Sequence, residues 1–171
     1  MQTYFELFSL AQNFNIDLAK LDLAYQQKVT QFHPDNFATA SDKDKNLALQ
    51  NTSLINTAYD TLKSNLTRAT YLLELEGVNA FDEKDTQMNV DFLMSQISLR
   101  EDLEAIEAAH DELALDDFIE QLGEKIKTNV NDIRIAFESS DTQDQIKNSV
   151  RELKFYEQLN THAKQLMDEW I

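Results

Sequence analysis

Residues Phe32-His33-Pro34-Asp35 hold the only proline of the 171-residue chain and lie between two segments of helical periodicity. Because proline disfavours a helical conformation at the residue before it, a helix that approaches this motif must end near His33. The motif itself supplies a rigid turn, a carboxylate and an imidazole. We therefore expect a pair of antiparallel helices, with a polar loop over residues 33–40 between them.

The segment before the motif predicts an amphipathic helix. Asp17 is suited to the N-cap, and Ile16 and Leu21 flank it at the spacing of a hydrophobic staple. The apolar stripe that follows a helical period consists of Leu18, Leu21, Tyr25, Val29 and Phe32. Lys20 lies on the opposite side of this helix, and Lys28 lies on its flank.

The segment after the motif predicts a second long helix. It begins at Ser41, with Asp44 three residues later in a capping-box-like pattern. Its expected apolar face consists of Leu47, Leu54, Ile55, Ala58, Tyr59 and Leu62. Short helices are expected near residues 4–10 and over residues 66–76, and Gly77 is suited to the position just after a helix end.

Residues 77–89 interrupt the periodicity, so we expect a linker there between two domains, residues 1–76 and 90–171. The apolar pattern of the second domain predicts three helices: one over about 90–109, one rich in apolar residues from Leu115 to Phe137, and one from near Asp141 to the C-terminus. Strands and tight turns use glycine and proline often, and the chain holds two glycines and one proline. The expected fold is therefore all-α, with an N-terminal helical hairpin and a C-terminal three-helix bundle.

The acidic charge of the chain limits its partners. The net charge is −16, and residues 77–171 carry 22 acidic and 9 basic side chains. Such a field repels phosphate, so we expect no nucleic-acid partner and no membrane partner. Since no apolar run approaches the roughly 18 residues that span a bilayer, and the first residues do not resemble a targeting segment, we expect a cytoplasmic protein.

The residues that usually carry catalysis or bind metals are sparse. There is no cysteine, and His33, His110 and His162 lie too far apart for the usual zinc spacings. No glycine-rich phosphate loop is present. His33 and Asp35 could imitate an acid–base pair, but no pocket is indicated for them. We therefore expect no catalytic residues, no metal, no cofactor and no enzymatic activity.

The helix expected over residues 90–109 has apolar side chains on two faces. Its core stripe consists of Phe92, Leu99, Leu103 and Ile106. The far side carries Val90, Leu93, Met94 and Ile97, with Glu101 and Glu104 at the rim. One stripe is enough for a bundle helix, so the second stripe favours binding of a partner, although packing against the N-terminal domain would also explain it.

Several motifs resemble the HscB family of J-domain (DnaJ-type) co-chaperones. In the first half they are Tyr4-Phe5-x-Leu7-Phe8, Phe32-His33-Pro34-Asp35, Ile55-Asn56-x-Ala58-Tyr59-x-x-Leu62 and Arg68-Ala69-x-Tyr71-Leu72-Leu73. Phe92-Leu93-Met94 and Leu99-Arg100-Glu101 continue the resemblance in the second half. The resemblance covers nearly the whole chain. It implies a J-domain within residues 1–76 and a client-binding domain over residues 90–171.

The resemblance also implies two protein partners. His33, Pro34 and Asp35 would engage a DnaK/HscA-class chaperone and stimulate its ATPase, with Lys20 and Lys28 as the basic residues of the same face. An IscU-type iron–sulfur cluster scaffold protein would be delivered to that chaperone. The scaffold-binding residues that the resemblance implies are Leu93, Met94, Ile97, Glu101 and Phe155.

Some positions depart from the family pattern. Asn36 follows the His-Pro-Asp motif where relatives commonly have lysine, the basic face of the preceding helix is thin, and Ser98 and Ala105 stand at acidic positions. Phe155 points away from one apolar stripe of its helix, which favours an exposed contact, but it also shares a side with Leu159 and Leu166, which leaves a core role open.

An acidic helical adaptor remains the alternative function. In that case the His-Pro-Asp motif would be only a turn, and the protein would bind a basic partner without regulating a chaperone. Binding by such an adaptor should collapse at high salt because exposed charges are screened.

Overall fold

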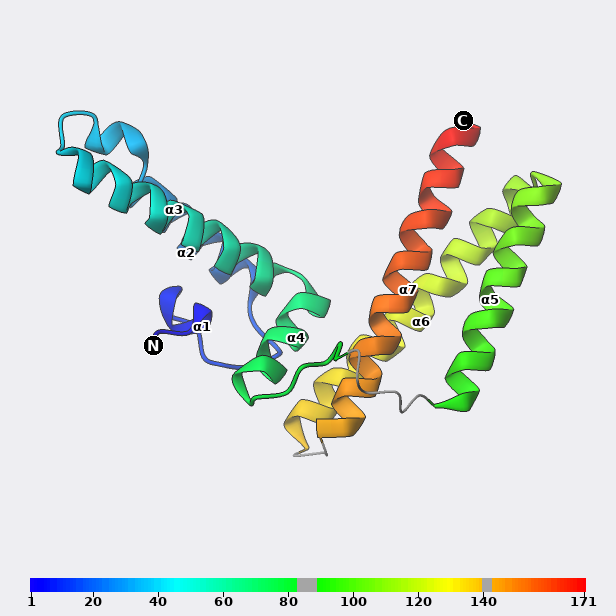
Figure 1. Ribbon diagram of the computed structural model, residues 1–171. Coiled ribbons are helices and arrows are strands. Elements are labelled where there is room, and N and C mark those ends of the chain that lie inside the picture. Colours follow the sequence, from blue (N-terminus) through cyan, green and yellow to red (C-terminus); the bar gives the residue numbers. More distant parts are fainter. Residues whose placement is uncertain (83–88, 140–142) are drawn as a thin grey trace. The chain divides into compact units, whose positions relative to one another are not determined.

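The structure is a computed structural model that describes residues 1–82, 89–139 and 143–171. These residues form helices joined by loops, with no strand among them, and they divide into two compact units, Met1–Leu75 and Glu76–Ile171 (Figure 1). The expected all-α fold is confirmed.

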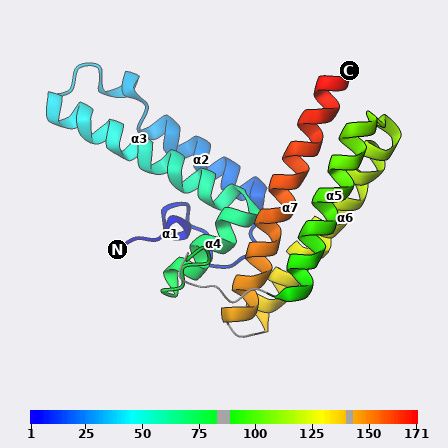
Figure 2. The ribbon, with the colours of Figure 1, turned by 45° about the vertical axis from the view of Figure 1, so that its right-hand side comes forward.

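The N-terminal unit is built on two long antiparallel helices, α2 (Leu18–Gln31) and α3 (Asp42–Lys63), which run side by side in both Figure 1 and Figure 2. Asp17 caps α2, since its carboxylate accepts hydrogen bonds from the first backbone N–H groups of the helix. Ser41 caps α3 by accepting from the backbone N–H of Asp44 at 3.2 Å. Both helices therefore begin at the predicted caps, and α2 ends before His33, as the proline requires.

Two shorter helices, α1 (Tyr4–Leu7) and α4 (Asn65–Leu75), complete this unit. The rings of Tyr4 and Tyr71 stack with their centroids 4.5 Å apart, and the backbone N–H of Tyr4 donates to the hydroxyl oxygen of Tyr71 at 3.0 Å. The buried apolar residues of the unit include Phe5, Phe8, Phe14, Leu21, Ala48, Ile55, Ala58, Leu62, Ala69, Leu72 and Leu73. They place the core where the base of the hairpin meets the short helices.

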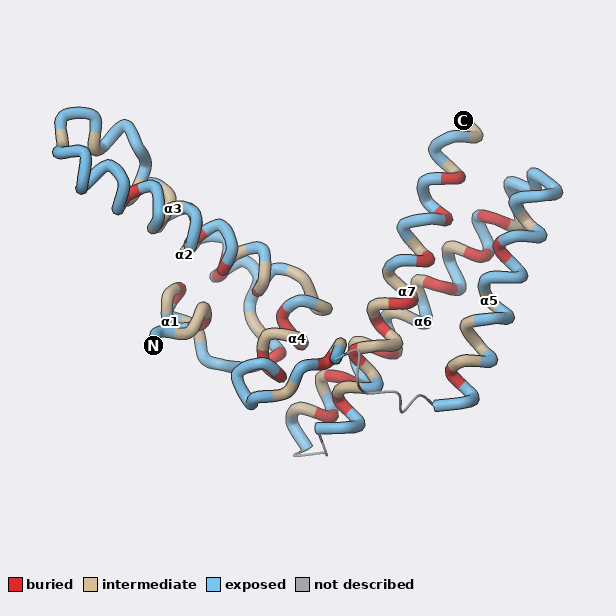
Figure 3. Tube along the Cα trace, in the orientation of Figure 1, coloured by how far each residue is buried: buried red, intermediate tan, exposed pale blue. Residues whose placement is uncertain are grey.

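Three apolar residues assigned to buried stripes lie on the surface instead. The exposed fractions of Leu18, Leu47 and Leu54 are 47%, 53% and 46%. The buried residues of α3 are Ala48, Ile55, Ala58 and Leu62. On a helical wheel Leu47 and Leu54 fall beside this stripe, and Figure 3 shows that the outer end of the hairpin is mostly exposed. Two helices without a third layer bury only the narrow seam between them.

A buried arginine connects several segments of the N-terminal unit. Arg68 is 4% exposed, and its guanidinium donates hydrogen bonds to the carbonyl oxygens of Phe14 and Leu62 and to Oδ1 of Asn65, at 2.6, 2.7 and 2.6 Å. It also lies over the Phe14 ring, 4.8 Å from the centroid. Burial lowers the pKa of Arg68 to about 10, which leaves it charged at neutral pH.

The C-terminal unit contains three long helices in mutual contact: α5 (Val90–Ala109), α6 (Glu112–Glu138) and α7 (Gln143–Trp170). Helix α5 has the predicted bounds, whereas the predicted start of the last helix near Asp141 lies outside the described residues. One buried cluster of the unit consists of Phe92, Leu103, Leu115, Phe118, Leu122, Phe155, Leu159, Ala163 and Leu166. A three-helix bundle is therefore confirmed.

The described part of the expected linker lies against α7. Gly77 has a φ of +81°, the left-handed conformation expected just after a helix end. Ala80 is buried, and its carbonyl oxygen accepts a hydrogen bond from Nε of Arg151 at 2.7 Å. Nζ of Lys154 lies 4.3 Å from the centroid of the Phe81 ring. These contacts attach the segment to the C-terminal unit, while residues 83–88 lie outside the described residues.

Candidate protein-interaction sites

The His-Pro-Asp motif is exposed at the end of the α2–α3 hairpin. Pro34–Phe37 form one turn of 3₁₀ helix, and Nδ1 of His33 accepts a hydrogen bond from the backbone N–H of Asp35 at 3.2 Å. A carboxylate oxygen of Asp35 lies 3.5 Å from the same nitrogen, and the side chains of His33 and Asp35 are 52% and 91% exposed. The loop thus displays an imidazole and a carboxylate to solvent, as the sequence predicts.

Two side-chain hydrogen bonds connect this loop to the hairpin. Nδ2 of Asn36 donates to the carbonyl oxygen of Thr30 at 2.7 Å, and the hydroxyl of Thr52 shares its hydrogen between the carbonyl oxygens of Ala48, at 2.8 Å, and Phe32, at 3.2 Å. The bonds to Thr30 and Phe32 satisfy carbonyl groups that the end of α2 leaves without helical partners. Asn36, a departure from the family pattern, therefore braces the loop.

The basic residues assigned to the same face both lie on α2. Lys20 is exposed in the first turn of the helix, and Lys28 is half-buried in its last turn. Lys28 lies eight positions after Lys20, or about 12 Å farther along the helix axis. Between them, Tyr25 of α2 stacks on Tyr59 of α3 with ring centroids 4.0 Å apart. This stack connects the two helices of the hairpin.

The second apolar face of α5 is exposed. Val90, Met94 and Ile97 are 69%, 64% and 54% exposed, and Leu93 is half-buried. We call these four residues the outer patch. Glu101 and Glu104 are exposed beside it. The opposite side of α5 contributes its predicted core stripe, since Phe92 and Leu103 are buried and Leu99 and Ile106 pack against the same cluster.

Phe155 is buried, and the prediction of an exposed ring is wrong. Its exposed fraction is 6%, and the ring meets that of Phe92 edge-to-face with centroids 5.8 Å apart. It belongs to the core cluster with Leu159 and Leu166, as the core alternative allowed. Helix α7 contacts both α5 and α6 and therefore needs a second apolar stripe besides the one that contains Val150.

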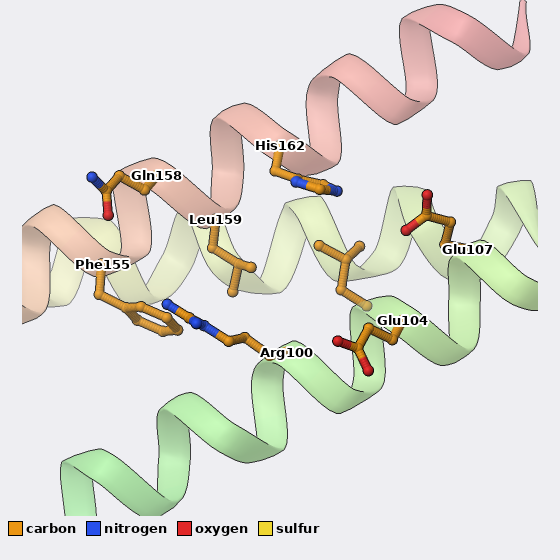
Figure 4. A pocket seen from close by; sticks show the side chains of 8 residues that line it. Arg100, Glu104, Glu107, Phe155, Gln158, Leu159 and His162 are labelled. Atoms are coloured by element: carbon orange, nitrogen blue, oxygen red, sulfur yellow. The ribbon is translucent and has the colours of Figure 1, made fainter.

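A groove lies between α5 and α7, with α6 behind it, as Figure 4 shows. Its volume is about 370 Å³, and it is lined by Arg100, Leu103, Glu104, Glu107, Phe155, Gln158, Leu159 and His162. We call it the α5–α7 groove. The guanidinium of Arg100 lies over the Phe155 ring, 5.3 Å from the centroid, while Glu104, Glu107 and His162 lie toward the other end. Sequence reasoning missed this groove because its residues come from segments about fifty positions apart.

A second cavity, of about 380 Å³, lies between α6 and α7 and includes Asn129, Asp132, Glu152 and Tyr156 in its lining. Asn129 is 5% exposed, and its Nδ2 donates to a carboxylate oxygen of Glu152 at 3.4 Å. Burial raises the pKa of Glu152, the hydrogen bond from Asn129 lowers it, and the negative charge of Asp132 raises it. The only sequence signal for this polar contact is an asparagine among the apolar residues of α6.

Residues 1–82, 89–139 and 143–171 contain no group of three or more acidic or histidine side chains placed to hold a metal ion. Among the helices described in the same ranges, none combines the length and apolar character needed to cross a membrane.

Comparisons with known proteins agree with this architecture. Residues 88–164 match a family model described as the HSCB C-terminal oligomerisation domain. A co-chaperone protein HscB homolog of Aliivibrio salmonicida (strain LFI1238) is 40% identical over 169 residues, which are 98% of each chain.

Two solved structures share the fold over nearly the whole chain. Chaperone HscB from Vibrio cholerae has a TM-score of 0.87 and 35% identity, with 99% of this chain and 100% of that chain covered. The human co-chaperone protein HscB has a TM-score of 0.89 and 28% identity, with 96% and 82% covered. The N-terminal hairpin with its exposed His-Pro-Asp loop is thus a J-domain. Together with the full-length identity to the curated relative, this shows that the chain belongs to the HscB family of co-chaperones.

Proposed function

We propose that this protein stimulates the ATPase of a DnaK/HscA-class chaperone and delivers an IscU-type iron–sulfur cluster scaffold protein to it. The observation that supports the proposal most directly is the exposed loop of His33 and Asp35 at the end of the α2–α3 hairpin. In this proposal the chaperone binds and hydrolyses ATP. The co-chaperone has no catalytic residues or cofactor of its own and acts by binding.

The loop offers suitable chemistry for a charged partner. A carboxylate as exposed as that of Asp35 can accept charge-assisted hydrogen bonds from an arginine of the chaperone. The backbone N–H of Asp35 donates to Nδ1 of His33, so Nε2 is the ring nitrogen that remains to contact the partner. Lys20 and Lys28 add positive charge on α2, which favours association with an acidic chaperone surface.

The outer patch offers a complementary surface for the scaffold protein. Exposed apolar side chains at Met94 and Ile97 gain free energy when a partner covers them, and a methionine adapts to irregular surfaces. Glu101 supplies a carboxylate beside them. Phe155 lies beneath Arg100, three residues after Ile97 on α5, and contributes to the core behind this helix. Because one protein holds both partners, the local concentration of scaffold near the chaperone rises.

The role of the loop is tested by the ATPase rate of the chaperone, measured with and without the scaffold protein. We expect His33→Gln to lose most of the stimulation while the helical circular dichroism spectrum stays unchanged. The control is Glu120→Gln, because Glu120 is exposed on α6 and lines neither the α5–α7 groove nor the outer patch. Normal stimulation by His33→Gln would contradict the role assigned to the loop.

The role of the outer patch is tested by scaffold affinity. We expect the double variant Met94→Ala, Ile97→Ala to bind the scaffold at least tenfold more weakly, with basal chaperone stimulation unchanged. Leu113→Ala is the control because Leu113 is 81% exposed on α6, outside the patch. The measurement at low and high salt also separates this proposal from the acidic adaptor, since apolar contacts persist when charges are screened.

A further inference from the structure

One line of side chains runs along α5 from the outer patch into the α5–α7 groove. Leu93, Ile97, Arg100, Glu104 and Glu107 follow one another at steps of four and three residues, which keeps them on one side of the helix. At 1.5 Å per residue the line is about 21 Å long. It begins with apolar side chains and ends with carboxylates that line the groove.

The groove combines an apolar floor with an acidic end. Leu103 and Leu159 are 4% and 8% exposed and form the floor. Glu104 and Glu107 are exposed, and within the described part of the chain neither carboxylate has a cationic side chain within 4.0 Å. The group that faces them from α7 is His162, as Figure 4 shows. The carboxylates are therefore available to an external cation.

These properties select one kind of occupant. A volume of about 370 Å³ over an apolar floor accommodates a few aliphatic side chains, and carboxylates next to it favour an ammonium or guanidinium group. An acidic segment is repelled, because helix α5 carries five acidic side chains and one basic side chain. A second copy of this chain, the occupant that the description of the matched family model suggests, is distinguished from the scaffold by the crosslinking measurement below.

We infer that the α5–α7 groove is the second half of the scaffold-docking surface and takes a scaffold segment with a lysine or arginine next to an apolar side chain. The apolar side chain packs on Leu103 and Leu159, and the cation lies between Glu104 and Glu107. This inference rests on the proposed scaffold binding. The outer patch contributes affinity, and the groove selects segments of positive charge.

The inference is tested by the dissociation constant of the scaffold for the full-length protein, measured at about 50 mM and 300 mM salt. We expect the double variant Glu104→Gln, Glu107→Gln to bind about tenfold more weakly at low salt, with a smaller difference at high salt. Asp116→Asn, Glu120→Gln is the matched control, since it removes two exposed charges from α6 that do not line the groove. The control should bind like the unaltered protein.

A second measurement identifies the occupant. Because the chain has no cysteine, Gln158→Cys allows a photo-crosslinker to be attached at one position in the groove. The crosslinked scaffold peptide, identified by mass spectrometry, should contain lysine or arginine within three residues of the attachment point. A peptide without a basic residue there would overturn the inference.

The outcomes separate the two proposals. Equal scaffold affinity for the glutamine variant and its control would reject the groove while leaving the outer patch as the docking site. If the unaltered protein does not bind the scaffold, the proposed function fails and the identity of the occupant fails with it. Weaker binding confined to the glutamine variant supports both.

Discussion

The guanidinium carbon of Arg100 lies 5.3 Å from the centroid of the Phe155 ring. The same ring meets Phe92 edge-to-face in the core of the C-terminal unit. Arg100 therefore covers the ring on the side of the groove, while the other contacts of the ring are internal. The Arg100–Phe155 pair therefore connects the core of the bundle to the groove. Variants of Phe155 test the packing of the core, and variants of Arg100 test the side of the ring that faces the groove.

The buried position of Phe155 predicts a large loss of stability on truncation. Phe155→Ala should lower the free energy of unfolding of the C-terminal unit by about 3–5 kcal/mol, because removal of a buried ring leaves a cavity. Arg100→Ala should lower it by about 0.5–1 kcal/mol through loss of the cation–π contact. Urea denaturation followed by circular dichroism measures both. If the free energy of unfolding of Phe155→Ala lies within about 0.5 kcal/mol of that of the unaltered protein, as for typical surface substitutions, the buried position of Phe155 is contradicted.

The hydrogen bond from Asn36 to the Thr30 carbonyl predicts a modest effect on the loop. Asn36→Ala should destabilise the N-terminal unit by about 0.5–1.5 kcal/mol, the usual contribution of one hydrogen bond. In this variant the backbone amide of residue 36, which donates to the carbonyl oxygen of His33 in the unaltered protein, should exchange faster. Gln27→Ala, at an exposed position of α2, is the control. Unchanged exchange in the loop would show that Asn36 does not brace it.

Arg68 should be essential to the N-terminal unit. Arg68→Met should lower its free energy of unfolding by roughly 3 kcal/mol, since the carbonyl groups of Phe14 and Leu62 lose their charged donor. Arg68→Lys should recover only part of this loss because an ammonium cannot reproduce the planar fork of donors. Thermal unfolding of both variants gives the measurement. Full stability of Arg68→Lys would show that the charge alone matters.

The raised pKa of Glu152 predicts a pH dependence of stability. Burial is the main cause of the shift from the usual value of 4.5. Since the folded state holds this proton more tightly than the unfolded state, the contribution of Glu152 to stability is complete below pH 4.5 and is lost as pH rises through the raised pKa.

Glu152→Gln should therefore lose less stability than the unaltered protein when the pH is raised from 4 to 7. Urea midpoints across this range measure the difference. Glu120→Gln, at an exposed position of α6, should keep the pH profile of the unaltered protein. Parallel profiles for Glu152→Gln and the unaltered protein would mean that this carboxyl is not desolvated in the fold.

The sequence alone determined the features that depend on neighbouring residues. The caps at Asp17 and Ser41, the end of α2 before Pro34 and the bounds of α5 follow from local hydrogen bonding and backbone geometry, which a linear pattern records. The exposed His-Pro-Asp loop and the outer patch were also predictable, because a loop between two helices and a second apolar stripe both have clear sequence patterns.

Only the tertiary structure decided which surfaces are covered. The burial of Phe155, the exposure of Leu47 and the hydrogen bonds of Arg68 depend on which helices or loops pack over each position. The α5–α7 groove likewise exists because Arg100 and Phe155, on different helices, are brought together by packing. Helical periodicity defines the faces of one helix, but the contacts between helices depend on all of them at once, and no single segment encodes them.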